Sequence, residues 1–275
     1  MTSALRLRKA LRENWRAWRK ALRRLEKRAS KSTRAVHAFR VATRRLWAID
    51  AALRAASAKS LSEHRRLRRA MRAAGRLRDM QLCIAQLEAL SRRSAAAGAI
   101  ADDLRSSLRD RQRRTDEAVG RVRPRKIKKR FFALLPAAPS ERDAARLLAH
   151  ATARLEQYRR MLERDSTDCL PRPTVEQLHA LRLQIKQARY LSECLSGLGS
   201  AAQPRSQSAA STLRNLQDAL GRVTDQRMVL RTIRKWIGRS ERRRKQAASL
   251  LAIVERRQRT AIVRALAQLQ RAIRQ

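Results

Sequence analysis

Two segments of the chain place a histidine ahead of cations at helical spacing. The first is VHAFRVATRRLW, residues 36–47, and the second is VEQLHALRLQIKQARY, residues 175–190. Aligned on the histidine, both read His-Ala-x-Arg, then an apolar residue, and then a basic residue at the same spacing. Wound as helices, both segments gather their cations into a narrow stripe, which consists of His37, Arg40 and Arg44 in the first and of His179, Arg182, Lys186 and Arg189 in the second.

The side of each helix opposite its stripe is apolar, with Phe39 and Leu46 in the first and Leu181 and Ala188 in the second. This pattern is typical of a helix that packs one side into a core. A solvated charged face is the commonest role of such a stripe. Two observations favour a binding site instead. Like charges four residues apart repel each other with few acidic residues nearby, and two of the four histidines occupy matching positions in the repeat.

The residue types in the stripes suit an anion built of phosphate groups. Arginine can form two parallel hydrogen bonds with phosphate oxygens, and a histidine protonated beside phosphate donates from both ring nitrogens. Single-stranded nucleic acid usually also needs aromatic side chains on which its bases stack. Aromatic residues make up only 3% of the chain, most of them on the sides predicted to face a core, and Trp47 is the one aromatic near the first stripe. A ligand made of phosphate alone is therefore favoured.

Further arginines recur at three- and four-residue spacing close to the first stripe. The predicted binding residues accordingly also include Arg45, next to Arg44, and the row formed by Arg65, Arg69, Arg72 and Arg76. A similar row near the N-terminus contains Arg12, Arg16 and Arg19. Two interpretations of these rows stay open: they widen the same cationic patch, or they only keep the protein in solution.

The whole chain is strongly cationic. Its 275 residues include 67 lysines and arginines against 23 acidic residues, a formal net charge of +44. Because charge of one sign opposes compaction, a polyanionic partner is the first inference. Yet 43% of the residues are hydrophobic, far more than a disordered basic tail carries, so we expect a folded core. A coiled coil is disfavoured because no heptad register persists beyond a few turns.

Composition predicts an all-α fold, since only 7 glycines and 6 prolines accompany abundant Leu, Ala, Arg and Gln. The expected helices span residues 4–29, 34–57, 60–95 and 99–121, and then residues 141–165, 174–197, 205–238 and 241–273. We predict one four-helix bundle in residues 1–123 and a second in residues 141–275. The linker between them, residues 124–140, has prolines at 124, 136 and 139.

The repeat extends beyond the two histidine segments. Both halves continue with Gly-Arg-apolar-x-Asp, which runs from Gly75 to Asp79 in the first and from Gly221 to Asp225 in the second. Two motifs in the same order at nearly the same separation favour an internal duplication. Each aspartate is expected to neutralise an arginine between helices or to favour a helix start. A catalytic carboxylate would need a partner acid or a metal, and no comparable partner is evident.

The sequence lacks several signals of other protein classes. Cys83, Cys169 and Cys194 are odd in number and fit no metal spacing, so we expect reduced thiols in a cytoplasmic protein. No apolar run is long enough for a membrane span. Residues 1–20 resemble an amphipathic transit peptide in composition, but the apolar pattern continues past them, which favours a first helix. No P-loop, nucleophile set or acidic metal cluster is present, so we expect no enzyme, cofactor or metal site.

The histidine blocks resemble those of a known family. His37-x-x-Arg40-Val-x-x-Arg44-Arg45 and Leu178-His179-x-x-Arg182-Leu-x-x-Lys186 are similar to motifs of the CHAD domain, the conserved-histidine α-helical domain, and residues 75–79 and 216–221 resemble its later motifs. The resemblance covers nearly the whole chain. It implies two pseudo-symmetric four-helix bundles whose basic faces line a central groove or pore that binds inorganic polyphosphate. Trp47 and Gln187 stand where the family tends to have basic residues.

We therefore expect a stand-alone, non-catalytic protein that binds inorganic polyphosphate in the cytoplasm, with polyphosphate granules as a candidate location. The alternative is a nonspecific nucleic-acid-binding protein, because net charge alone does not separate one phosphate polymer from another. A third hypothesis is that the protein is an enzyme, a polyphosphate phosphatase or kinase. Oligomeric state and preference for chain length are not set by any feature of the sequence.

Overall fold

The computed structural model describes residues 2–27, 32–53, 61, 64–133, 140–169, 173–196, 203–238 and 240–274. These residues form helices and no strand, so the predicted all-α fold is confirmed. In chain order the helices are α1 (Ser3–Lys27), α2 (Thr33–Leu53), α3 (Arg65–Ser91), α4 (Ala95–Ser106), α5 (Leu108–Gly120), α6 (Pro124–Phe132), α7 (Glu141–Cys169), α8 (Val175–Ser196), α9 (Gln203–Ile237) and α10 (Glu241–Arg274).

The helices differ from the prediction in two places. Residues 99–121, expected as one helix, belong to α4 and α5, which are separated at Ser107. The expected linker contains α6, because Pro124 lies in a first helical turn, where its missing N–H removes no hydrogen bond. Ile127 and Phe131, four residues apart, are buried on one side of α6. Residues 134–139, which include Pro136 and Pro139, lie outside the described residues.

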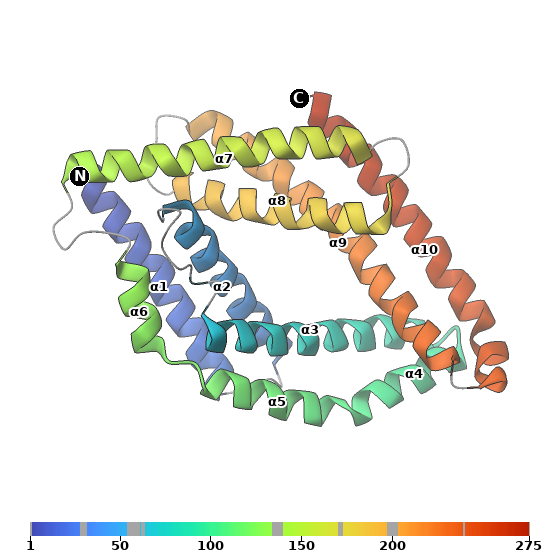
Figure 1. Cartoon of the computed structure of the whole chain (residues 1–275). Coiled ribbons are helices and arrows are strands. Elements are labelled where there is room, and N and C mark those ends of the chain that lie inside the picture. Colours follow the sequence, from blue (N-terminus) through green and yellow to red (C-terminus); the bar gives the residue numbers. More distant parts are fainter. Residues whose placement is uncertain are drawn as a thin grey trace.

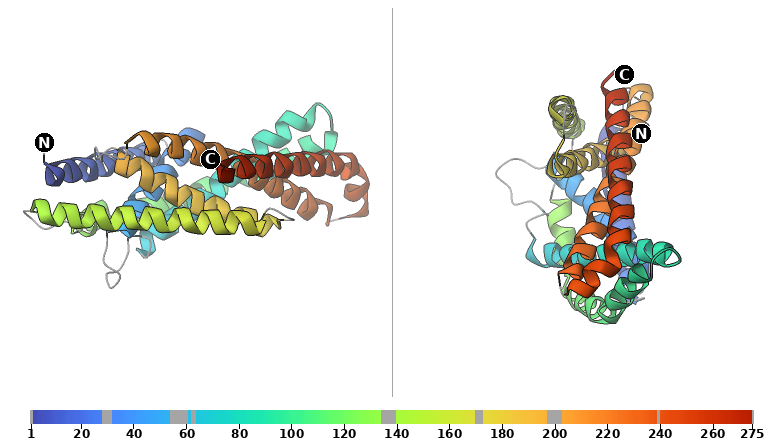
Figure 2. Two further views of the ribbon diagram at one scale, coloured as in Figure 1. Left: turned by 90° about the horizontal axis from the view of Figure 1, so that it is seen from above. Right: turned by 90° about the vertical axis from the view of Figure 1, so that its right-hand side faces the viewer.

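The four helices that carry the repeated motifs form a closed set of neighbours. Helix α2 packs against α3 and α8, and α9 also packs against α3 and α8. In Figure 1 these four helices surround the middle of the molecule, with α1, α5, α7 and α10 outside them. Figures 1 and 2 both show α9 and α10 running alongside each other. The two histidine segments, on α2 and α8, are therefore neighbours in space.

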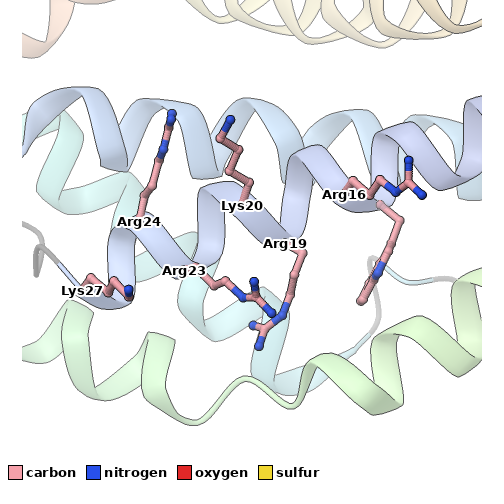
Figure 3. A pocket seen from close by; sticks show the side chains of 7 residues that line it. Arg16, Arg19, Lys20, Arg23, Arg24 and Lys27 are labelled. Atoms are coloured by element: carbon pink, nitrogen blue, oxygen red, sulfur yellow. The ribbon is translucent and has the colours of Figure 1, made fainter.

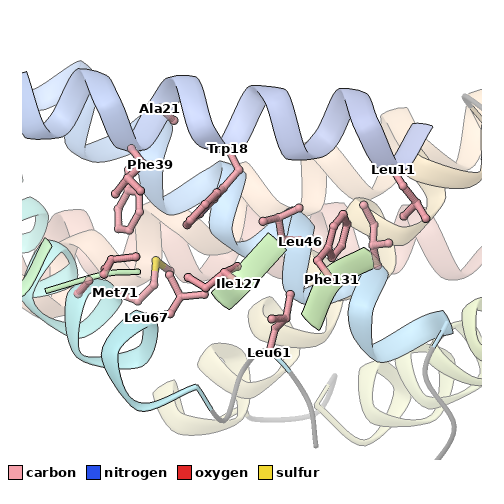
Figure 4. Close-up of a cluster of buried hydrophobic side chains, with 14 of the residues drawn as sticks. Leu11, Trp18, Ala21, Phe39, Leu46, Leu61, Leu67, Met71, Ile127 and Phe131 are labelled. Carbon is pink, nitrogen blue, oxygen red and sulfur yellow. The ribbon is translucent and has the colours of Figure 1, made fainter. Parts of the chain in front are cut away.

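The buried hydrophobic residues form three clusters, and two of them draw on both halves of the chain. The first joins α1, α2, α6 and the beginning of α3 (Figure 4). It also contains residues of α7 and α8. The second joins the end of α3 and α4 to α9 and α10. The third lies among α7, α8, α9 and α10. Helix α3 contributes to both the first and the second cluster, so the clusters do not separate the chain into two four-helix bundles. The two bundles and the internal duplication stay predictions.

A buried hydrogen-bonded chain sets how α2 faces α1. The indole Nε1 of Trp18 donates to Oγ1 of Thr43 at 3.0 Å, and that hydroxyl donates to the carbonyl oxygen of Phe39 at 2.8 Å. All three residues are fully buried. A buried indole N–H without an acceptor would be costly, so this contact fixes the apolar side of α2 toward α1. The cationic stripe of α2 consequently faces away from α1.

The structure also bears on the expectations for the cysteines and for membrane spans. Cys83 is buried and free, while the side chains of Cys169 and Cys194 lie outside the described part of the chain. Among the helices described, none is long and apolar enough to span a bilayer.

Candidate functional site

The cationic stripe of α2 lies beside a buried, mainly apolar side. Phe39 and Leu46 are 0% exposed and belong to the first hydrophobic cluster. His37 is exposed, whereas Arg40 and Arg44 are partly buried. The helical winding predicted from the sequence therefore agrees with the burial seen in the structure. Partial burial of two arginines four residues apart already indicates that this stripe is more than a solvated surface.

The stripe of α8 is buried more deeply. Lys186 is only 8% exposed, and His179 and Arg182 are partly buried. The Nε atom of Arg182 is buried and has no hydrogen-bond partner among the residues described. A buried donor without an acceptor is unfavourable by about 1–3 kcal/mol. The side chain of Arg182 thus has capacity to bind an acceptor that the described chain itself does not supply.

The two stripes converge where α2 packs against α8. Arg44 lies close enough to Arg182 for its charge to disfavour the charged form of Arg182, and Lys186 is similarly affected by Arg40 and Arg44. Helices α3 and α9 add charged residues to the same place. We call this set the central cluster; it comprises His37, Arg40, Arg44, Arg78, Asp79, His179, Arg182, Lys186 and Asp225.

The central cluster is electrostatically unfavourable in the absence of an anion. Burial, followed by the charges of Arg182, Arg44 and Arg40, lowers the pKa of Lys186 from 10.5 to about 6, and Asp225 only partly opposes this. Burial and the charge of Arg44 lower the pKa of Arg40 to about 10. The cations therefore destabilise each other's charged forms, and pKa shifts of this kind concentrate at functional sites.

The pKa values of the two histidines are lowered as well. His37 is exposed on its outer edge, but loss of solvent on the side facing the cluster is the main cause that lowers its pKa, and the charges of Arg78 and Arg40 add to it. Burial also lowers the pKa of His179, with Arg182 as the next cause. Both imidazoles thus favour the neutral form until a negative charge arrives. A phosphate group beside them would reverse the balance and favour two donating ring nitrogens.

The two aspartates of the repeat do not begin helices. Asp79 lies within α3 and Asp225 lies within α9, so the predicted role at a helix start is wrong. Burial raises the pKa of Asp225 and the charge of Asp79 adds to this, while Arg182, Lys186 and Arg78 oppose the rise. Among the described residues, neither carboxylate forms an ion pair within 4 Å. They moderate the positive charge of the central cluster without cancelling it.

The glycine of each repeat lies against the arginine of the preceding histidine segment. A Cβ atom at Gly75 would overlap Nη1 of Arg40, and a Cβ atom at Gly221 would lie 3.8 Å from Nε and from Nη2 of Arg182. Both glycines are buried in the middle of a helix. The two motifs that recur separately along the sequence are therefore in contact, once between α2 and α3 and once between α8 and α9.

Two of the predicted binding residues have internal partners instead. Arg45 forms an ion pair with Glu193 of α8 at 2.9 Å. Arg189 pairs with the same carboxylate at 2.7 Å, donates to Gln217 of α9 at 3.0 Å and lies over the ring of Tyr190. These contacts hold α8 to α2 and α9 next to the central cluster. The spacing of cations along one helix could not reveal them, because Arg45 and Gln217 come from other helices.

The row of arginines on α3 is exposed and lies outside the central cluster. Arg69, Arg72 and Arg76 line a groove between α3 and α5, and Arg65 is exposed at the start of α3. At the two positions that depart from the family pattern, Trp47 packs against the first hydrophobic cluster and Gln187 is exposed. The Nε1 atom of Trp47 is buried without a partner among the described residues.

Arg78 is the member of the central cluster that sequence reasoning did not select. Its charge acts on His37 and Arg40 of α2 and is itself favoured by Asp225 of α9. The sequence feature that could have identified Arg78 is its position within the repeated segment Gly75–Asp79. Only the packing of α3 against both α2 and α9 distinguishes Arg78 from the other arginines of that helix.

The cations of α1 form a separate surface. Arg16 and Arg19 line a shallow hollow of about 550 Å³ together with Trp15, Lys20, Arg23, Arg24 and Lys27, all from α1 itself. Figure 3 shows Lys20 and Arg24 on one side of the helix and Arg19 and Arg23 on the other. Arg12 lines a neighbouring hollow on the same helix. This row does not extend the central cluster.

Comparison with known proteins gives one match. The model of the CHAD domain family matches residues 6–234. That span contains every member of the central cluster and both repeated glycines. No curated protein and no solved structure matches the chain.

Proposed function

Because this chain belongs to the CHAD domain family, we propose that it binds inorganic polyphosphate at the central cluster and does not alter it chemically. The observation that carries the proposal is Lys186, which is 8% exposed and has Arg40, Arg44 and Arg182 as electrostatic neighbours. An almost buried lysine among arginines is unfavourable in the free protein. A chain of phosphates is a ligand that would supply many negative charges to this one place.

The chemistry of the ligand follows from the donors present. Guanidinium groups bind phosphate oxygens through two parallel hydrogen bonds, and a polyanion gains further affinity when its condensed counterions are released. Tyr190 lies within electrostatic reach of Arg182, but it is only 4% exposed and the guanidinium of Arg189 lies over its ring, so the ring is not open to nucleic-acid bases. A bare phosphate polymer therefore fits the cluster better than a single-stranded nucleic acid does. Residence in the cytoplasm and recruitment to polyphosphate granules belong to the same proposal.

A competition experiment tests the proposal against its main alternative. Labelled polyphosphate bound to the protein is challenged with duplex DNA or with RNA at equal phosphate concentration and moderate salt. We expect neither nucleic acid to displace polyphosphate readily, because the cations of the cluster bind closely spaced phosphates and no exposed aromatic ring is there for bases to stack on. Easy displacement by either one would favour a nonspecific nucleic-acid-binding protein. Phosphate release that survives purification and is lost in D79N or D225N would instead show an enzyme.

The two repeated glycines provide a matched pair of substitutions. In Gly75→Ala the new methyl group occupies the position of Nη1 of Arg40, so the guanidinium must move. In Gly221→Ala the methyl group meets Arg182 at 3.8 Å, an ordinary contact. We expect G75A to weaken polyphosphate binding by about tenfold, the effect of one lost charge-assisted hydrogen bond, and G221A to change it by less than about twofold. Isothermal titration calorimetry measures both.

Thermal unfolding of the same two variants is the control. Replacing glycine by alanine inside a helix stabilises it by up to about 1 kcal/mol, so neither variant should unfold at a lower temperature than the wild type. Equal losses of affinity in the two variants would contradict the placement of Arg40 against Gly75 at the binding site.

A further inference from the structure

A cationic groove runs between α3 and α5, outside the central cluster. Its volume is about 780 Å³. Both helices contribute arginines to it: Arg66, Arg69, Arg72 and Arg76 from α3, and Arg114, Arg121 and Arg123 from α5 and the residues after it. Helix α5 packs against α3, whereas the central cluster is built from α2, α3, α8 and α9. None of the groove arginines is among the charges that shift a pKa in the central cluster. The groove and the cluster are therefore distinct sets of residues that share α3.

Most of the charge in this groove is not balanced by the protein. Glu117 is the one acidic residue that lines it, and its carboxylate pairs with Arg113 at 3.3 Å. Arg114 pairs with Asp110 at 2.8 Å. The other six arginines of the groove form no ion pair within 4 Å among the residues described. Cations on two facing walls repel each other, and an anion lying between them would relieve that repulsion.

The lining of the groove indicates the chemistry of that anion. Its cations are all arginines, whose planar donors match phosphate oxygens in pairs. Apart from arginines and Glu117 it contains only Ala73, Ala118 and Gly120, so no aromatic ring is available for a base. The two helix walls would contact an extended anion from both sides. A linear phosphate polymer meets these requirements without any contact to sugars or bases.

We propose that the groove between α3 and α5 is a second polyphosphate-binding site, which holds another stretch of the same chain that occupies the central cluster. This inference rests on the proposed function, because it assumes that the cluster binds polyphosphate. Two sites on one protein make the second contact of a long chain intramolecular, so affinity rises once the ligand can reach both. The protein consequently favours long chains over short ones, a selectivity that neither site has alone.

Calorimetry with two defined ligands tests the second site. Tripolyphosphate, too short to bridge separate sites, should occupy two sites on the wild type. It should occupy one on the groove variant R69A/R121A, which removes an exposed arginine from each wall. Long-chain polyphosphate should bind this variant about tenfold more weakly than the wild type, since bridging is lost. The control R257A/R259A removes two exposed arginines of α10 and should match the wild type with both ligands.

The outcomes separate this inference from the proposed function. If tripolyphosphate occupies one site on the wild type and R69A/R121A leaves it unchanged, the second site is wrong and the central site stands. If R69A/R121A loses affinity for RNA and none for polyphosphate, the groove binds nucleic acid and the inference is overturned. Equal losses of polyphosphate affinity in R69A/R121A and R257A/R259A would show that overall positive charge, and not the groove, accounts for the binding, and the inference would be wrong. A wild-type protein that binds neither ligand would overturn both proposals.

Discussion

Replacing both Arg40 and Arg182 by alanine should weaken polyphosphate binding by at least about 100-fold, because each guanidinium contributes about 1.5–3 kcal/mol through charge-assisted hydrogen bonds. The two side chains come from different halves of the sequence and lie in one central cluster. Removing two phosphate-binding cations should also reduce the slope of log affinity against log salt by about one per cation. Titrations at several salt concentrations measure both effects.

The helices of this double variant should remain intact. Arg40 and Arg182 are partly buried cations that repel their neighbours, so their removal relieves unfavourable charge instead of breaking an ion pair. Circular dichroism checks the helical content. The matched control is R257A/R259A, which removes the same charge from an exposed part of α10. If the control loses as much affinity as R40A/R182A, general charge accounts for binding and the central cluster is not a specific site.

The second large effect concerns Lys186, whose replacement by methionine should stabilise the free protein while weakening its ligand binding. Methionine keeps a similar volume and removes a charge that burial disfavours. Exchanging buried charges for apolar residues often stabilises proteins by about 1–4 kcal/mol, which corresponds to several degrees in melting temperature. Binding of polyphosphate should weaken by about tenfold, as one charge-assisted contact is lost. Thermal unfolding and calorimetry report the two effects separately.

The pH dependence of the wild type follows from the same residue. The pKa of Lys186 is about 6 in the folded protein against 10.5 ordinarily. Between these values the unfolded chain binds a proton that the folded chain does not, so stability of the free protein falls as pH drops from about 10 to about 6 and then levels off. Polyphosphate favours the protonated lysine. Binding should therefore take up protons and tighten as the pH falls from about 8 to about 6.

The variant K186M should lose this dependence over that pH range. His37 and His179, whose pKa values are also lowered, add proton uptake mainly at the acidic end and remain in the variant. Lys20→Met is the control, since Lys20 is exposed on α1 and its loss should leave the melting temperature unchanged. A K186M protein that melts at a lower temperature than the wild type would show that Lys186 stabilises the fold. The interpretation of the central cluster would then be wrong.

Local features of this protein were predictable from the sequence. Helix periodicity depends on residues three and four apart, so the stripe containing His37 and Arg40 and the apolar side containing Phe39 could be recognised without any tertiary contact. The same reasoning identified the matching stripe at His179. The prediction failed at the break between α4 and α5 at Ser107, and also where local signals conflict. Pro124 was taken for a linker residue although it begins α6, since proline suits both positions.

The membership of the central cluster needed the tertiary structure. Arg45 and Arg189 follow the stripes as regularly as Arg40 does, yet both pair with Glu193. Arg78 belongs to the cluster because α3 packs against both α2 and α9. These differences depend on which remote helices meet and in which register, and no spacing within one helix encodes that.

The sequence by itself thus determined that the chain is helical and cationic and that two short motifs recur in it, because composition and periodicity are local properties that do not depend on how the helices are arranged. The tertiary structure alone decided that Lys186 is buried among arginines of two helices and that Gly75 lies against Arg40. Burial and the nearness of other charges are properties of the packed molecule, and they make one lysine among many cations the centre of the proposed site.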